Sequence, residues 1–239
     1  MKNILFIATG GTIASKKTDS GLTPQITPQE LLSYVPGIAD FCKVTAVTPF
    51  NLDSSNVRPD NWRMIIHTIW ENYEKYDGFV IAHGTDTMAY SASTLSFMIE
   101  GLTKPVIFTG SQLPIGTPRT DGKENLISSV EIAAAKDEEG HPLVPEVCIC
   151  FDNVLIRGNR SRKFNSDNFR AFRSEDYPPL AEAGISIRYN RSLIRRPDSW
   201  EARPIFHTEL DTRVSILKIH PGITPGVVRN ILLGEDTRA

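Results

Sequence analysis

A chain of 239 residues is long enough for one large domain, or for one domain and part of another. Its apolar fraction of 40% and charged fraction of 23% are ordinary for a globular protein. The formal net charge of −2 excludes a global basic field for nucleic acid or an anionic membrane. No apolar run approaches the ~18 residues of a membrane span, and the first apolar run is too short for a signal peptide.

Short apolar runs bounded by polar residues recur along the chain. They predict strands at Asn3–Ala8, Lys43–Val47, Phe79–Ala82, Val106–Phe108 and Val147–Phe151. Segments between them show helical periodicity or helix-boundary signals, and predict helices at Pro59–Tyr76, Met88–Glu100 and Asp121–Ala135, the last opening with a capping box at Asp121–Glu124. Strands that alternate with helices predict an α/β fold with a doubly wound, mostly parallel sheet.

The cysteines indicate a reducing compartment. Cys148 and Cys150 lie on one face of the predicted strand, because alternate residues of a strand share a face. Such a pair could belong to a metal site, but no second Cys pair or His pair at ligand spacing accompanies it. With three cysteines in all, we expect buried free thiols and a cytoplasmic location.

The last third of the chain has a different character. Residues 167–213 are rich in Pro, Arg and Asp without periodicity, and predict long loops and a linker. Val214–Ile219 then predicts a new strand and Pro225–Leu233 a new helix. A single βα unit has no strand to pair with by itself. We therefore expect an N-terminal α/β domain at residues 1–190, a linker at 191–213, and the start of a smaller α/β domain at 214–239 that the end of the chain cuts short.

Two predicted strands end in loops that combine glycine with threonine, Thr9–Ala14 and His83–Met88. In parallel α/β folds, ligands bind at the carboxyl ends of strands, so the loops could present hydroxyls and amides to one crevice. That would suit attack by a threonine, with the oxyanion held by N–H groups. The alternatives are a tight turn at the glycine pair and a helix cap at Asp86. The first loop matches neither a dinucleotide fingerprint nor a phosphate-binding motif.

Three further polar segments are candidates for the same site. Phe50–Asn56 would suit either a turn or the carboxylate of a small zwitterion, and Val106–Gln112 is another polar strand end. Arg157–Lys163 is a dense basic cluster, for which a solvated loop and nucleic-acid contact are the alternatives. The near-neutral chain and the lack of interleaved aromatic residues argue against nucleic acid. A lysine turned inward could help to deprotonate a threonine.

Thr9–Ala14 followed by His83–Met88 resembles the paired signature of the bacterial-type L-asparaginases, the asparaginase/glutaminase family. The similarity extends through Leu52–Ser55, Gly78–Tyr90, Lys104–Leu113, Asp121–Asn125, Arg157–Lys163 and Leu180–Ile185. Leu52–Ser55 and the lack of a signal peptide are most similar to the cytosolic type I branch. The resemblance implies an amidohydrolase that converts L-asparagine to L-aspartate and ammonia through a threonine-linked acyl-enzyme. It implies no metal or organic cofactor, and a homodimer or homotetramer at full length.

The resemblance also implies roles for individual residues. Thr12 matches the nucleophile, and Thr85 and Lys163 match a second threonine and its lysine partner. Asp86 matches the carboxylate that holds the substrate's α-amino group, and Ser54 matches the serine at its α-carboxylate.

Other positions match the family's substrate contacts. Backbone N–H groups of Gly11 and Thr85 would bind the amide oxygen, and the Ser111 backbone would lie beside the leaving amide. Ser55 stands where the periplasmic enzymes carry glutamine, and Leu22 stands at or near the place of a mobile tyrosine. The family also continues into a C-terminal domain that completes a neighbour's site, and most of it is missing here. A glutaminase, an amidotransferase subunit and an inactive ligand-binding fragment are therefore the alternative functions.

Overall fold

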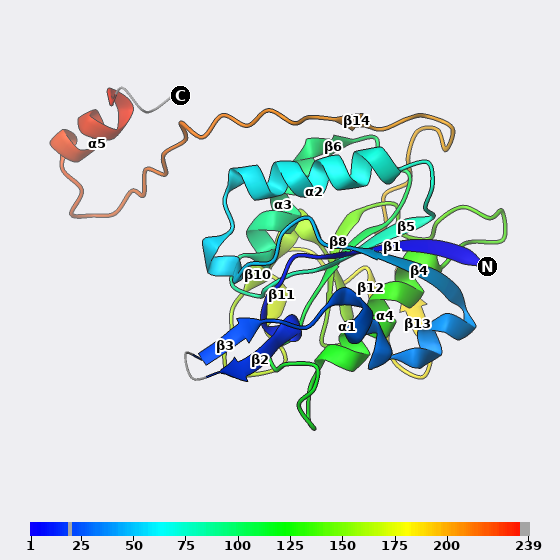
Figure 1. Cartoon of the computed structure of the whole chain (residues 1–239). Coiled ribbons are helices and arrows are strands. Elements are labelled where there is room, and N and C mark those ends of the chain that lie inside the picture. The colour runs from blue at the N-terminus through cyan, green and yellow to red at the C-terminus, as the bar shows by residue number, and fades with distance from the viewer. Residues whose placement is uncertain (19–20, 235–239) are drawn as a thin grey trace. The chain divides into compact units, whose positions relative to one another are not determined.

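The computed structural model describes residues 1–18 and 21–234. The chain divides into two compact units, residues 1–208 and 209–239, and the last five residues of the second unit lie outside the described part. The first unit is built on a sheet of eight strands in the order β13-β12-β9-β8-β7-β5-β1-β4 (Figure 1). The predicted α/β fold with a mostly parallel sheet is confirmed.

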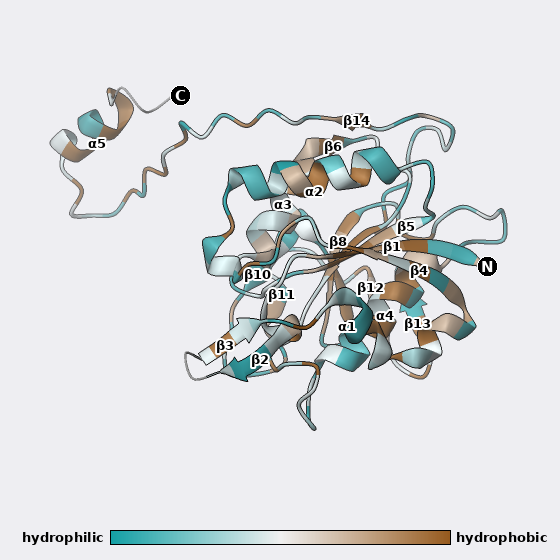
Figure 2. Ribbon diagram, in the orientation of Figure 1, coloured by the Kyte–Doolittle hydropathy of each residue, from teal (hydrophilic) through white to brown (hydrophobic). Residues whose placement is uncertain are grey.

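Five neighbouring strands of this sheet are parallel. They are β4 (Cys42–Val47), β1 (Lys2–Ala8), β5 (Gly78–Ala82), β7 (Val106–Thr109) and β8 (Val147–Phe151). All five were predicted to within one residue at each end. They form continuous apolar runs because both faces of a parallel sheet are covered, and Ile4 to Ile7 of β1 are all 0% exposed. Figure 2 shows these hydrophobic residues gathered along the central strands.

The sheet continues with antiparallel strands that the sequence did not predict. β9 (Val154–Arg157), β12 (Ala181–Ala183) and β13 (Ile187–Tyr189) extend it beyond β8. The expectation of long loops over residues 167–213 is therefore wrong in part, since β11 (Phe172–Ser174) and β14 (Ile205–Phe206) also form there. Strands of two or three residues are too short to show an alternating pattern, and only their partners in the fold define them.

Small two-stranded sheets flank the main one. β2 (Ser15–Thr18) and β3 (Gly21–Pro24) are paired antiparallel, β10 (Ser161–Lys163) pairs with β11, and β6 (Ile99–Glu100) pairs with β14. The predicted helix over Met88–Glu100 thus ends two residues early, because Ile99 and Glu100 pair with β14. Four short 3₁₀ helices are η1 (Thr12–Ala14), η2 (Pro36–Asp40), η3 (Ser54–Asn56) and η4 (Gly158–Arg160).

Helices cover both faces of the main sheet. α2 (Pro59–Asn72) and α3 (Met88–Met98) lie on one side of it, and α1 (Pro28–Ser33) and α4 (Gly122–Ala134) on the other (Figure 1). Cys148 and Cys150 pack in the core cluster that includes α4 residues, and both thiols are free and buried. Burial raises the pKa of Cys150 to about 12. Among residues 1–18 and 21–234, no helix has the length and apolar character to cross a membrane.

The second unit differs from its prediction. Val214–Ile219 is not a strand, and Ile216 is 90% exposed. A strand needs a neighbouring strand for its backbone hydrogen bonds, and residues 209–234 contain no such strand. The predicted helix is confirmed as α5 (Pro225–Leu232). Residues 191–208, expected as a linker, belong to the first unit, where the Arg157 guanidinium donates to Leu193 O at 2.9 Å.

Candidate active site

Polar loops follow four adjacent strands, β4, β1, β5 and β7, at the same edge of the sheet. Because these strands are parallel, their carboxyl ends lie together. From β1 the chain passes to β4 on one side, and then to β5 on the other side of β1. The loops after β1 and β5 therefore flank a point where the strand order reverses, which is where open α/β sheets bind ligands.

Glycines allow the backbones of these loops to touch. A Cβ atom added to Gly11, whose φ is 79°, would lie 2.4 Å from Gly84 Cα, and one added to Gly84 would lie 2.6 Å from Ser54 Oγ. No real side chain tolerates such distances, so these positions require glycine. Thr12 and Thr85 each follow one of the two glycines, and the contact therefore brings the two threonine-bearing loops together, as a shared crevice requires.

Thr12 begins η1 and is partly exposed. Neither its hydroxyl nor its backbone N–H forms a hydrogen bond with any residue of the described ranges. The preceding carbonyl is held in place, since Gly11 O accepts from Ser15 Oγ at 2.9 Å and from Ala14 N at 3.2 Å. Thr12 thus presents an unoccupied hydroxyl on a fixed backbone.

Thr85 lies in a chain of hydrogen bonds with three other side chains. Its Oγ1 donates to Gln112 Oε1 at 3.2 Å and accepts from Lys163 Nζ at 2.9 Å. Lys163 Nζ also donates to Asp86 Oδ1 at 2.7 Å. Lys163 has a 15% exposed side chain, whereas that of Asp86 is 60% exposed. The arrangement couples a largely covered lysine to one threonine and leaves a carboxylate facing solvent.

Strand alternation explains why Lys163 turns inward while its neighbour Arg162 does not. Lys163 ends β10 opposite Phe172 of β11, whereas its neighbour Arg162 is 65% exposed and pairs with Glu175 at 3.4 Å. Arg160 is exposed as well. The predicted contact between Lys163 and Thr85 is present, and the outward direction of the two arginines agrees with the sequence-based expectation.

The serines of the predicted substrate site differ in their environments. Ser54 is buried and its Oγ lies against Gly84, while the Ser55 hydroxyl donates to Asp53 Oδ1 at 2.7 Å and is therefore occupied. Ser111 is buried, and its hydroxyl donates to Leu113 O. Asp86 does not cap α3, whose N-cap is Thr87. Its carboxylate is thus not needed for helix capping.

The predicted role of the Gly11 N–H does not agree with the structure. That N–H donates to Leu52 O at 3.0 Å, because a parallel bridge between Gly10 and Leu52 extends the pairing of the β1 and β4 segments. It has no free proton to offer an oxyanion. In the described part of the chain, the backbone N–H groups of Thr12 and Thr85 have no acceptor.

Two functional candidates, Gln112 and Asp121, were missed from the sequence. Gln112 accepts from Thr85, and its Nε2 donates to Ser166 O and Asn168 O at 3.0 and 3.1 Å. The Asp121 carboxylate accepts from the N–H groups of Gln112 and Leu113 instead of capping α4, so the predicted capping box is wrong. Burial raises the pKa of Asp121. The available signal was the position of Gln112 directly after Ser111 in a strand-end loop.

Leu22, which stands at or near the place of the family's mobile tyrosine, lies in the two-stranded sheet of β2 and β3 that follows η1. Leu22 of β3 is 52% exposed and lines a hollow of about 430 Å³ together with Ser15 and Tyr34. No tyrosine among the described residues hydrogen-bonds the Thr12 hydroxyl.

His83 begins the loop that follows β5, and it is 1% exposed. Its Nδ1 is 2.8 Å from Gly84 O, and its Nε2 is 2.9 Å from Ser91 Oγ. Burial lowers the pKa of His83 from 6.5 to about 4. The folded chain therefore holds a neutral imidazole at a pH where an unfolded chain would hold an imidazolium.

This difference predicts a loss of stability in acid. The unfolded chain binds a proton below pH 6.5, whereas folded His83 resists it until about pH 4, so the stabilisation is complete above 6.5 and falls as the pH falls. Between pH 7 and 4 the expected loss is on the order of 3 kcal/mol of unfolding free energy. Urea denaturation at several pH values should show a steeper dependence for the wild type than for His83→Asn. Equal dependences would contradict the neutral, buried state.

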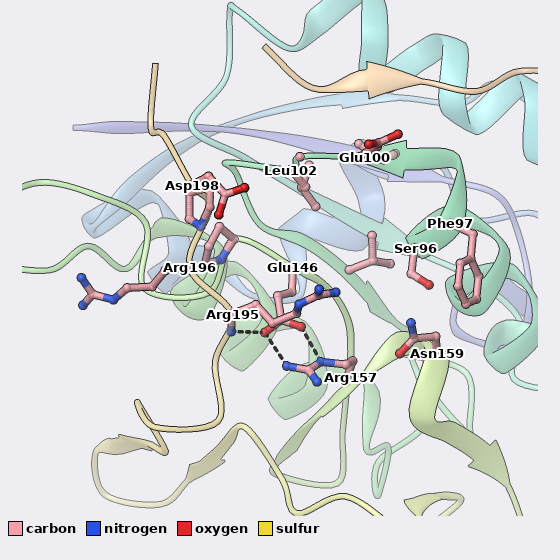
Figure 3. A pocket seen from close by; sticks show the side chains of 15 residues that line it. Ser96, Phe97, Glu100, Leu102, Glu146, Arg157, Asn159, Arg195, Arg196 and Asp198 are labelled. Carbon is pink, nitrogen blue, oxygen red and sulfur yellow. Dashed lines mark hydrogen bonds and ion pairs between the residues drawn. The ribbon is translucent and has the colours of Figure 1, made fainter. Parts of the chain in front are cut away.

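A separate hollow of about 410 Å³ lies near the start of β8 and does not include the threonines (Figure 3). Two of the charged residues that line it, Arg157 and Glu146, pair with each other. The Arg157 guanidinium donates to both oxygens of the buried Glu146 carboxylate at 2.5 and 3.0 Å, and Arg195 N donates to one of them at 2.7 Å. Arg157, from the predicted basic cluster, therefore has a structural partner and is not available to the crevice.

Known proteins share both the sequence and the fold of this chain. Residues 3–195 match the family model described as Asparaginase, N-terminal. The chain is similar to L-asparaginase 1 of Escherichia coli (strain K12), with 42% identity over 237 residues that cover 97% of this chain and 67% of the relative. It is also similar to the 60 kDa lysophospholipase of Mus musculus, with 35% identity, covering 97% of this chain and 44% of the relative.

Among solved structures, L-asparaginase I from Vibrio cholerae O1 biovar eltor str. N16961 is similar, with a TM-score of 0.86 and 39% identity, covering 98% of this chain and 69% of that one. The resemblance to the type I branch is thus confirmed in sequence and in fold. The family model covers most of the chain, including the threonine loops and Lys163. The chain therefore belongs to the asparaginase family of amidohydrolases.

Proposed function

We propose that this chain hydrolyses the side-chain amide of L-asparagine to give L-aspartate and ammonia, with Thr12 as the nucleophile. The observation that carries the proposal is the pairing of an unoccupied Thr12 hydroxyl with a Thr85 hydroxyl bound to Lys163 at 2.9 Å, in adjacent strand-end loops. The Escherichia coli relative is named L-asparaginase 1, which supports the choice of substrate.

The reaction proceeds in two halves. Thr12 Oγ1 attacks the amide carbon as its proton passes to Thr85 Oγ1, and the backbone N–H groups of Thr12 and Thr85 stabilise the oxyanion. The carbon–nitrogen bond then breaks, the nitrogen takes up a proton and leaves as ammonia, and an ester with Thr12 remains. Water adds to this ester, gives up a proton, and releases L-aspartate and the free hydroxyl.

Thr85 and Lys163 act as one proton-handling unit in this scheme. The Lys163 ammonium donates to Thr85 Oγ1, which makes the threonine proton easier to give up and the oxygen easier to hold as a partial anion. Gln112 accepts the Thr85 proton in the resting arrangement, at 3.2 Å. Rotation of that hydroxyl toward the crevice would let Thr85 pass a proton to the leaving nitrogen and take one from the attacking water.

Substrate recognition rests on Asp86 and Ser54. One carboxylate oxygen of Asp86 binds Lys163, and the other has no partner in the described chain, so it can accept from the substrate's α-ammonium. The Ser54 hydroxyl is buried beside Gly84 and would donate to the α-carboxylate. A small zwitterion satisfies both groups, whereas a plain amide satisfies neither.

The direct test is ammonia release by the 239-residue chain from L-asparagine, with L-glutamine measured in parallel. We expect release from asparagine. A second candidate function is ligand binding without turnover, and it is favoured because the chain spans 67% of the Escherichia coli relative. Saturable binding of L-aspartate without ammonia release would select that function, and release from glutamine alone would select a glutaminase.

Neutralising Asp86 is expected to weaken binding more than chemistry. Removing one partner of a charge pair commonly costs about 2–5 kcal/mol, and the 60% exposure of this side chain favours the lower end. Asp86→Asn should therefore raise KM for asparagine and weaken L-aspartate binding in calorimetry. Exposed Asp60 provides the control, because Asp60→Asn removes an ion pair with Arg63 outside the crevice. An unchanged aspartate affinity in Asp86→Asn would assign Asp86 a structural role alone.

We also propose a cytoplasmic location and an oligomeric assembly. The three cysteines are buried free thiols, which supports a reducing compartment such as the cytoplasm. A homodimer or homotetramer is proposed from the family resemblance, and sedimentation of the purified chain would test it.

A further inference from the structure

The side chains behind the Thr85 loop form a hydrogen-bonded chain with one possible direction. Trp62 Nε1 can only donate, and it lies 2.9 Å from Ser91 Oγ. At the other end, Gly84 O can only accept, and it lies 2.8 Å from His83 Nδ1. Nδ1 must therefore carry the imidazole proton. His83 Nε2 is then an acceptor, and the Ser91 hydroxyl donates to it at 2.9 Å.

This chain ends on the peptide group that carries a predicted oxyanion donor. Gly84 C=O and Thr85 N–H belong to the same peptide bond, and no peptide bond among the described residues is cis. In a trans peptide the C=O and N–H groups point in opposite directions. Because His83 holds the Gly84 oxygen on the buried side, the Thr85 N–H is directed away from His83. This N–H has no acceptor in the described chain.

Gly84 especially needs such an external restraint. It has no side chain to limit its backbone, and it lies in contact with Gly11, so the bond from His83 supplies orientation that neither residue provides. The network itself is anchored on rigid elements, since Trp62 belongs to α2 and Ser91 to α3. Two helices therefore determine the orientation of one loop peptide.

We propose that His83 is a positioning residue, which aims the Thr85 N–H at the oxyanion through its hydrogen bond to Gly84 O, with Ser91 and Trp62 fixing its tautomer. This inference rests on the proposed asparagine hydrolysis. It adds a residue that touches no substrate and neither gains nor loses a proton in the reaction. His83 would act through the geometry of the peptide bond alone.

Two substitutions at His83 separate positioning from structural support. The side-chain amide nitrogen of asparagine lies where Nδ1 does, so His83→Asn keeps a donor for Gly84 O. That of glutamine lies where Nε2 does, so His83→Gln keeps a contact with Ser91 but loses the donor. Each variant replaces the buried imidazole ring by an amide. Thermal unfolding of the two variants is the control that they are folded.

We expect His83→Asn to keep kcat within about threefold of the wild type and His83→Gln to lower kcat about tenfold, with KM for asparagine changed much less in both. Loss of a whole oxyanion donor lowers the rate about 10²–10³-fold, and misaiming one should lower it less. A folded His83→Gln variant with the kcat of His83→Asn would overturn the inference.

Nuclear magnetic resonance tests the same network without turnover. In ¹⁵N-labelled wild type, the proton of His83 should be on Nδ1, and the Thr85 amide resonance should move in His83→Gln but much less in His83→Asn. A proton on Nε2, or equal shifts of Thr85 in both variants, would overturn the inference. If the wild type releases no ammonia, the proposed function is wrong. The spectra would still test independently whether His83 orients the Thr85 N–H.

Discussion

Replacing Thr12 by alanine is expected to reduce ammonia release from L-asparagine by about 10⁴–10⁶-fold, the range typical of a lost nucleophile. The hydroxyl of Thr12 has no hydrogen-bond partner in the described chain, so its removal breaks no hydrogen bond. Thermal unfolding of Thr12→Ala should therefore match the wild type within experimental error. Rates can be measured by a coupled ammonia assay under single-turnover conditions.

The control for this experiment is Thr12→Ser, which keeps a hydroxyl at the same position. It should retain measurable turnover, and an ester of the substrate acyl group should accumulate on one residue only, detectable by mass spectrometry after rapid quenching. Near-normal turnover by folded Thr12→Ala would remove Thr12 from the mechanism. An ester found on Thr85 would exchange the roles of the two threonines.

Lys163→Met is expected to lower kcat by about 10²–10⁴-fold, which is the usual contribution of a group that assists proton transfer. Methionine occupies a similar volume but cannot donate to Thr85 Oγ1, which Lys163 Nζ reaches at 2.9 Å. If the two residues act as one unit, as proposed, adding Thr85→Val to Lys163→Met should cause little further loss. The measurement is a double-mutant cycle on kcat, together with unfolding curves for each variant.

Arg162→Met is the matched control, since Arg162 lies next to Lys163 on β10 but is 65% exposed and pairs with Glu175. Exposed ion pairs contribute at most about 1 kcal/mol, so this variant should keep both its stability and its kcat. Strictly additive losses for Lys163→Met and Thr85→Val would contradict a shared function. A similar loss in Arg162→Met would indicate a general effect of charge rather than a specific contact.

Sequence patterns predicted the parallel strands of the sheet because strands buried on both faces appear in the sequence as continuous apolar runs. Runs such as Phe79–Ala82 are apolar throughout and end abruptly in Gly, Thr and His, so both the strand and its functional end are visible. Lys163 could be selected within the basic cluster through the family resemblance, and strand alternation agrees with its inward direction.

Other features depend on partners that are distant in sequence. The strands β11, β12 and β13 have three residues each, too few to show a period. Asp121 has the spacing of a capping box, yet its carboxylate binds the N–H groups of Gln112 and Leu113 instead, which only the fold brings near. The strand predicted at Val214–Ile219 does not form for the opposite reason. Its apolar pattern is clear, but no described neighbour pairs with it.

The contact between Gly11 and Gly84 has a consequence for how the family can vary. At this point two main chains touch directly, with a hypothetical Cβ of Gly11 only 2.4 Å from Gly84 Cα. The separation of the two threonines is thus fixed by peptide geometry and not by the rotamers of packed side chains. Substitutions that repack the core beneath would then change the stability of the protein while the spacing of the two threonines stays the same.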